Sequence, residues 1–146
     1  MSRARSRSRR LALQALYQWQ VTGDDLGEII NHFLVEHPQR NFEVDYFRDL
    51  VRGVPARLDV LDQTLEPFLD RPIEEVDLVE RALLRMGAYE LADHLEVPYK
   101  VVINEAVELA KLFGAEQSHR YVNGVLDKVA RVLRPAETGT PPARDA

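Results

Sequence analysis

The stretch VPYKVVINEAVELAKLFGAEQSHRYVNGVLDKVAR, residues 97–131, decides the fold class. Its apolar residues recur three and four positions apart, which is the period of an α-helix and not that of a strand. Pro98 suits the first turn of a helix, and Gly114 is suited to end it. The stretch therefore predicts two helices, one over about Tyr99–Phe113 and one over about Gln117–Leu133.

The same period continues toward the N-terminus. It predicts further helices over about residues 8–21, 25–37, 42–52, 55–69 and 72–94. No alternating strand pattern is found. We therefore expect an all-α protein, a compact helical bundle of about seven helices.

Length and composition indicate one domain. A chain of 146 residues can bury a single core, and 45% of its residues are hydrophobic. We expect a flexible arginine-rich arm over residues 1–10, a single helical domain over 11–134 and a disordered tail over 135–146. The sequence has no cysteine and no long apolar run, which favours a cytoplasmic protein without disulfides or a membrane span.

The arm concentrates positive charge on an acidic protein. The whole chain has 19 basic and 24 acidic side chains, yet the first ten residues hold five arginines and no acid: Arg3, Arg5, Arg7, Arg9 and Arg10. Guanidinium groups match phosphate geometry, so the arm favours nucleic acid, and an arginine-rich segment commonly orders on RNA. A frayed, solvated terminus and a mitochondrial presequence are the alternatives.

The first predicted helix is apolar on two faces. Its core face holds Ala12, Ala15, Leu16 and Trp19, and its opposite face holds Arg10, Leu13, Gln14, Tyr17 and Val21. Such a helix is either covered by another helix or presents a second surface to a partner. The arginines just upstream favour the partner, because full burial would carry unpaired charge inside.

No catalytic or metal-binding pattern is recognisable. The four histidines are scattered, and none has the spacing of zinc ligands on a helix. Glycine-rich phosphate loops are missing. Glu90 lies near an apolar face, and we expect it to be a buried, hydrogen-bonded structural carboxylate. The sequence predicts no enzyme, no metal and no cofactor.

Three segments carry a resemblance to a known family. RRLALQALYQWQ (9–20), YFRDLVRGV (46–54) and the stretch 97–131 are similar to bacterial transcription antitermination proteins of the NusB family, over about residues 9–135. The resemblance implies two packed helical subdomains, a heterodimer with the ribosomal protein NusE, and binding of single-stranded boxA RNA. It also implies a place in the antitermination complex of RNA polymerase, and a homodimer is possible when the protein is free.

The resemblance also implies site residues. For RNA they are Arg3, Arg5, Arg7, Arg9, Arg10, Gln14, Phe68 and Arg71. For the partner they are Tyr17, Val21, Glu80, Gln117 and Tyr121. Phe68 stands where other members carry tyrosine, and Gln117 stands where some carry an acid, so a hydroxyl and a charge are absent there.

Two other classes stay open from the sequence. The helical domain also resembles the N-terminal RNA-binding domain of ribosomal RNA cytosine methyltransferases, of which this chain would be a detached fragment. A helical protein-interaction module without an RNA role is the third possibility.

Overall fold

The computed structural model describes residues 2–141, and within them all regular structure is helical. The longer helices are α1 (Arg3–Thr22), α2 (Leu26–Glu36), α3 (Val44–Ala56), α4 (Leu58–Leu65), α5 (Leu78–Asp93), α6 (Tyr99–Phe113) and α7 (Ser118–Leu133). Two 3-10 turns, η1 (Glu66–Phe68) and η2 (Ile73–Glu75), and the short α8 (Pro135–Thr138) complete the fold. The predicted all-α bundle of about seven helices is confirmed. None of the helices in residues 2–141 contains an apolar stretch of the length that a bilayer span requires.

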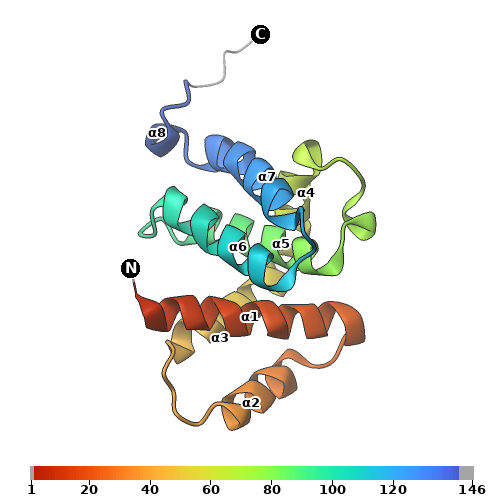
Figure 1. The fold of residues 1–146 in the computed structure, drawn as a ribbon, viewed down its shortest axis with the longest axis vertical. Coiled ribbons are helices and arrows are strands. Elements are labelled where there is room, and N and C mark those ends of the chain that lie inside the picture. The colour runs from red at the N-terminus through yellow and green to blue at the C-terminus, as the bar shows by residue number, and fades with distance from the viewer. Residues whose placement is uncertain (1, 142–146) are drawn as a thin grey trace.

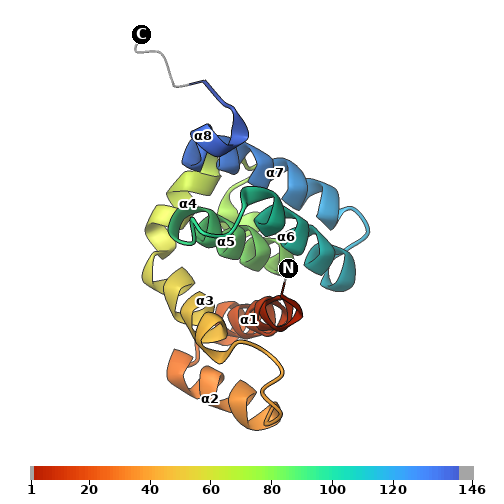
Figure 2. The same ribbon diagram turned by 90° about the vertical axis from the view of Figure 1, so that its left-hand side faces the viewer.

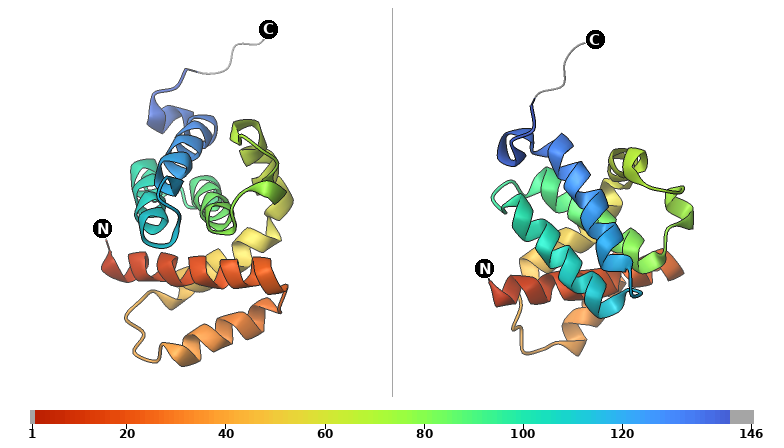
Figure 3. Two further views of the ribbon diagram at one scale, coloured as in Figure 1. Left: turned by 45° about the vertical axis from the view of Figure 1, so that its right-hand side comes forward. Right: turned by 45° about the horizontal axis from the view of Figure 1, so that its top comes forward.

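The helices form two packed subdomains. Helices α1, α2 and α3 make one, and α4 to α7 make the other, with α1 lying across the second subdomain (Figures 1 and 2). Helix α5 is the element that joins them, because it contacts α1 and α3 as well as α4, α6 and α7. Its residues from Ala82 to Leu91 are all buried, as expected for a helix with neighbours on every side. Figure 3 shows α5 between α4 and α6, above α1.

The arginine-rich arm is part of a helix. Ser2 is the N-cap of α1, and its Oγ accepts a hydrogen bond from the Arg5 N–H at 3.2 Å. The first turns are anchored by side chains, since Ser8 Oγ donates to the Glu43 carbonyl at 2.8 Å and Arg9 is buried. The prediction of a flexible arm over residues 1–10 is therefore wrong for residues 3–10.

Two predicted boundaries also change. Helix α3 continues through Gly53 and Pro55 to Ala56, where a break was expected. Gly53 lets α3 lie close to α5, because a Cβ there would lie 2.3 Å from the Tyr89 ring of α5. Helix α5 begins at Leu78 and not near residue 72, because the Asp77 side chain caps it by accepting from the N–H groups of the next turn.

The start of the predicted tail is also ordered. Arg134 is buried, and its guanidinium donates to the carbonyl oxygens of Glu90, Leu91, His94 and Val97 at 2.6–3.2 Å. Glu137 of α8 accepts from the Tyr99 N–H at 2.7 Å. This Arg134 clamp holds the end of α5 and the start of α6 together. The prediction of disorder is wrong for residues 135–138, and residues 142–146 lie outside the described part of the chain.

Candidate functional site

One exposed stripe runs the length of α1. Its residues follow one another at alternating spacings of four and three, which places them on one helical face. All are exposed: Arg3, Arg7, Arg10, Gln14, Tyr17 and Val21. We call this face the α1 stripe. Its first half is cationic and its second half is apolar, so two kinds of partner chemistry meet on one helix.

Arg9 does not belong to this stripe. It is 1% exposed, and its Nε and Nη2 donate to the Glu90 carboxylate at 2.9 Å. Tyr46 also donates to Glu90, at 2.7 Å. Burial and the Glu90 charge raise the pKa of Tyr46 well above its usual range. Arg9 is therefore not available for the predicted RNA contact in this structure, whereas the prediction of a buried structural carboxylate at Glu90 is confirmed.

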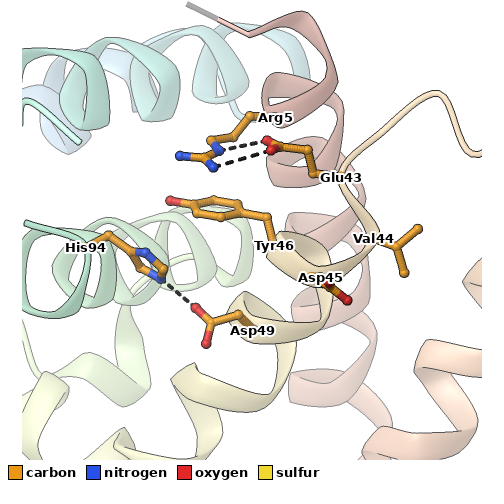
Figure 4. A pocket seen from close by; sticks show the side chains of 7 residues that line it. All are labelled: Arg5, Glu43, Val44, Asp45, Tyr46, Asp49 and His94. Atoms are coloured by element: carbon orange, nitrogen blue, oxygen red, sulfur yellow. Dashed lines mark hydrogen bonds and ion pairs between the residues drawn. The ribbon is translucent and has the colours of Figure 1, made fainter. Parts of the chain in front are cut away.

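Arg5 is held at a separate acidic pocket. Its Nε donates to Glu43 at 2.7 Å, and its guanidinium lies 4.3 Å from the centre of the Tyr46 ring. Figure 4 shows this pocket, a cavity of about 490 Å³ with Arg5 above Tyr46 and His94 below it. Its other acidic residues are Asp45 and Asp49. An RNA phosphate would meet repulsion here, so Arg5 is less available to RNA than the stripe arginines.

His94 lies between two carboxylates in that region. Its Nε2 is 2.5 Å from Asp49 and its Nδ1 is 2.9 Å from Glu96. Burial by itself would lower the pKa of His94, but the hydrogen bonds to Glu96 and Asp49 outweigh it and leave the pKa raised. Among the described residues, no group of three or more histidine and acidic side chains is placed to hold a metal ion.

The apolar half of the stripe borders a first cavity. This cavity, of about 520 Å³, is lined by residues of α1, α2, α5 and α6: Leu13, Gln14, Tyr17, Gln18, Phe33, Val79 and Phe113. Leu13 is buried, but Tyr17 is 40% exposed and Phe113 39% exposed. The opposite face of α1 is therefore covered only in part, and exposed aromatic rings remain at the cavity. The sequence reasoning missed Phe113, although it is the last residue of a predicted helix.

A second cavity adjoins the first at the start of α5. It has a volume of about 330 Å³ and is lined by Asp70, Arg71, Asp77, Glu80, Ala115, Gln117, Ser118 and Tyr121. Glu80 accepts a hydrogen bond from the buried Ser118 hydroxyl at 2.6 Å. Val79 and Glu80 are neighbours in sequence and line one cavity each. The structure thus brings Glu80, Gln117 and Tyr121 together, as neighbours of the Tyr17 cavity.

Arg71 shares this second cavity with the predicted partner residues. Its guanidinium forms a fork with the Asp70 carboxylate at 3.0 and 3.1 Å, and the Asp70 N–H donates to the Tyr121 hydroxyl at 3.4 Å. The hydrogen bonds from the Arg71 guanidinium lower the pKa of the Asp70 carboxyl group. Phe68 lies in η1, where it is partly buried against the core.

The fold and these surfaces define a class: an all-α protein that presents a basic helix end beside open apolar and polar cavities. Comparison with known proteins agrees. The NusB family model matches residues 6–131, and the chain belongs to the NusB family.

Individual relatives cover nearly the whole chain. A transcription antitermination protein NusB of Nitrosococcus oceani is 57% identical over 137 residues, covering 94% of this chain and 92% of that protein. One of Alkalilimnicola ehrlichii is 54% identical, covering 90% of this chain and 83% of that protein.

Solved structures are similar in fold. NusB of T. maritima is 30% identical and superposes with a TM-score of 0.83, covering 95% of this chain and 99% of that chain. A structure of the antitermination factors NusB and NusE in complex with dsRNA is 28% identical, with a TM-score of 0.79, and covers 90% of this chain and 99% of that one.

Proposed function

We propose that this protein is a transcription antitermination factor that binds RNA and NusE side by side and catalyses no reaction. The RNA is a boxA-type element of a nascent ribosomal RNA transcript, and the assembled complex acts on RNA polymerase. The relatives' names and the structural neighbour that holds NusE and RNA support this proposal.

The α1 stripe carries the proposal. Arg3, Arg7 and Arg10 form a row without an acid between them, which suits phosphates of a nucleic acid. Tyr17 and Val21 continue the same row as exposed apolar side chains beside the first cavity, which suits a protein partner. At 1.5 Å per residue the stripe is about 27 Å long, enough for both partners to lie next to each other.

The second cavity extends the proposed NusE surface. Glu80 is held by Ser118 and so offers a positioned carboxylate, while Tyr121 and Gln117 add an aromatic ring and an amide. Arg71 at its edge is the point where RNA and NusE would come closest. When NusE is absent, the same apolar surface would be free for a homodimer.

Fluorescence anisotropy tests the proposal. A labelled boxA-type RNA is titrated with the protein in the presence and absence of NusE, and a scrambled RNA of equal length is the control. The expected result is weak binding by the protein alone and tighter, sequence-selective binding with NusE, because the acidic body opposes RNA and the partner adds surface.

Binding that ignores both RNA sequence and NusE would contradict the proposal. A helical protein-interaction module would then be the better account. Sequence-selective binding that NusE leaves unchanged would instead favour an RNA-binding domain of the kind found in ribosomal RNA methyltransferases.

A further inference from the structure

Gly124 lies in the middle of α7, and no contact within the molecule requires a glycine at this position. A Cβ at Gly53 or Gly87 would collide with Tyr89 or Leu126, at 2.3 and 2.7 Å, so those helical glycines are needed for packing. A Cβ at Gly124 would meet nothing within 4 Å, and its φ is not in the left-handed region. Glycine in a helix interior lowers the folding equilibrium constant roughly fivefold relative to alanine. The free protein therefore gains nothing from this glycine.

The surface around Gly124 is exposed and polar. Arg120 and Lys128 lie four residues before and after it, so they flank it on the same face of α7. Neither forms an ion pair with any residue that the structure describes. Between the two cations the helix backbone is bare, because glycine supplies no side chain. A segment of another molecule can approach the backbone more closely here than at any position with a Cβ.

We infer that Gly124 is a close-approach point for the partner protein, and that the NusE surface extends along α7 from Tyr121 to Lys128. The inference rests on the proposed function. Tyr121 lies one turn before Gly124 and lines the second cavity with Glu80 and Gln117, so the two surfaces are continuous. The partner segment crosses α7 at Gly124, and its acidic or carbonyl oxygens meet Arg120 and Lys128.

Charge favours a protein over RNA at this face. Asp127 lies on the same face and pairs with Arg131 at 3.2 Å, which leaves an acid among the three cations of α7. The arginines of the α1 stripe have no acid among them. RNA phosphates would therefore bind the α1 stripe in preference to α7. The α7 face, with charges of both signs and a bare backbone, is better suited to a protein segment.

The test is the variant Gly124→Ala, studied in the full chain. We expect the folding equilibrium constant, measured by urea unfolding, to rise about fivefold because alanine is the better helix former. We expect affinity for purified NusE, measured by calorimetry, to fall at least tenfold because a methyl group enters the contact. Gly124→Leu should abolish measurable NusE binding. A loss of affinity in a protein that has become more stable cannot be due to damaged folding.

The matched control is Asn31→Leu, which adds an exposed leucine on α2 in the other subdomain and should leave NusE affinity unchanged. If wild-type protein binds NusE and Gly124→Ala binds equally well, the close-approach point is overturned while the proposed function stands. If Gly124→Ala weakens RNA binding by the protein alone, the face belongs to RNA and the inference is also overturned. If wild-type protein does not bind NusE, the proposed function itself fails.

Discussion

At the scale of single residues, neighbouring arginines of α1 have opposite roles. Arg7 points to solvent and donates to the Asn41 carbonyl at 2.9 Å, whereas Arg9 is buried against Glu90. Two residues along a helix rotate a side chain by about 200°, and this rotation separates a surface cation from a core ion pair. Amino-acid composition alone does not distinguish the exposed Arg7 from the buried Arg9.

Removing Arg9 should unfold the protein more easily. In Arg9→Ala the Glu90 carboxylate keeps its burial and loses its cation, which costs about 3–5 kcal/mol of unfolding free energy. Urea unfolding followed by circular dichroism measures this. Arg7→Ala is the control and should change stability by less than about 0.5 kcal/mol. Equal effects of the two variants would contradict the assignment of Arg9 to the core.

The salt dependence of RNA binding should show how many arginines of the α1 stripe contact phosphates. With Arg3, Arg7 and Arg10 each meeting one phosphate of single-stranded RNA, the slope of log affinity against log salt is about −2.1. Five contacting arginines would give about −3.5. Arg10→Ala should flatten the slope by about 0.7 in an anisotropy titration at several salt concentrations. A wild-type slope near −3.5 would mean that Arg5 and Arg9 leave their carboxylates on binding RNA.

His94 should make stability depend on pH. Its pKa is raised in the folded protein above the unfolded value of about 6.5, so protonation favours folding. The stabilisation is complete below that unfolded pKa and is lost as pH rises through the folded pKa. Urea unfolding from about pH 6 to pH 9 should show falling stability in wild type and a weaker dependence in His94→Gln. Identical profiles would mean that Asp49 and Glu96 do not hold a protonated imidazole.

At the scale of elements, the Arg134 clamp replaces a cap that the end of α5 lacks. His94 ends α5 without a left-handed glycine, and the buried Arg134 guanidinium adds hydrogen bonds to the carbonyl oxygens of that last turn. Arg134→Ala should lower the unfolding free energy by about 3 kcal/mol, because those carbonyls then lose a charged donor. The control is Arg131→Ala in the last turn of α7, whose exposed pair with Asp127 is worth less than about 0.5 kcal/mol. A thermal melt or urea titration compares the two, and similar losses would contradict the clamp.

The elements also show what the sequence could predict. The predicted bounds of the two helices between Tyr99 and Leu133 agree with the structure to within one residue. Strong periodicity and a proline at the start of the first helix made these bounds predictable. The helical arm was missed because Arg3–Arg10 lacks an apolar period, and its order comes from contacts with Glu43 and Glu90, about 40 and 80 residues away. Such contacts depend on tertiary structure and have no local signature in the sequence.

At the scale of the whole molecule, the two halves of the α1 stripe should act independently. Tyr17→Ala should weaken NusE binding at least tenfold, because it removes an exposed ring at the first cavity, and should leave RNA affinity of the protein alone unchanged. Arg7→Ala should weaken RNA binding and leave NusE affinity unchanged. Calorimetry with NusE and anisotropy with RNA give the two affinities. A Tyr17→Ala protein that is unfolded by circular dichroism would show that the ring belongs to the core.

The candidate site as a whole was only partly predictable. The alternating spacing from Arg3 to Val21 can be found in the sequence once a single helix is assumed. The junction of the two cavities cannot, because Val79 and Glu80 of α5 meet Tyr17 of α1 and Gln117 beyond α6 only after the two subdomains pack. The burial of Arg9 could not be predicted for the same reason, because its partner Glu90 lies 81 residues further along the chain.

That long separation has a consequence for synthesis on the ribosome. The chain is made from the N-terminus at about 5–20 residues per second, so Arg9 exists for about 4–16 s before Glu90 is added. Until then α1 can pack only against α2 and α3, and the part of its buried face that meets α5 is open together with the exposed stripe. The Arg134 clamp closes later still. A nascent chain therefore displays a helix with two apolar faces before α5 can cover one of them, so this helix needs protection early in translation.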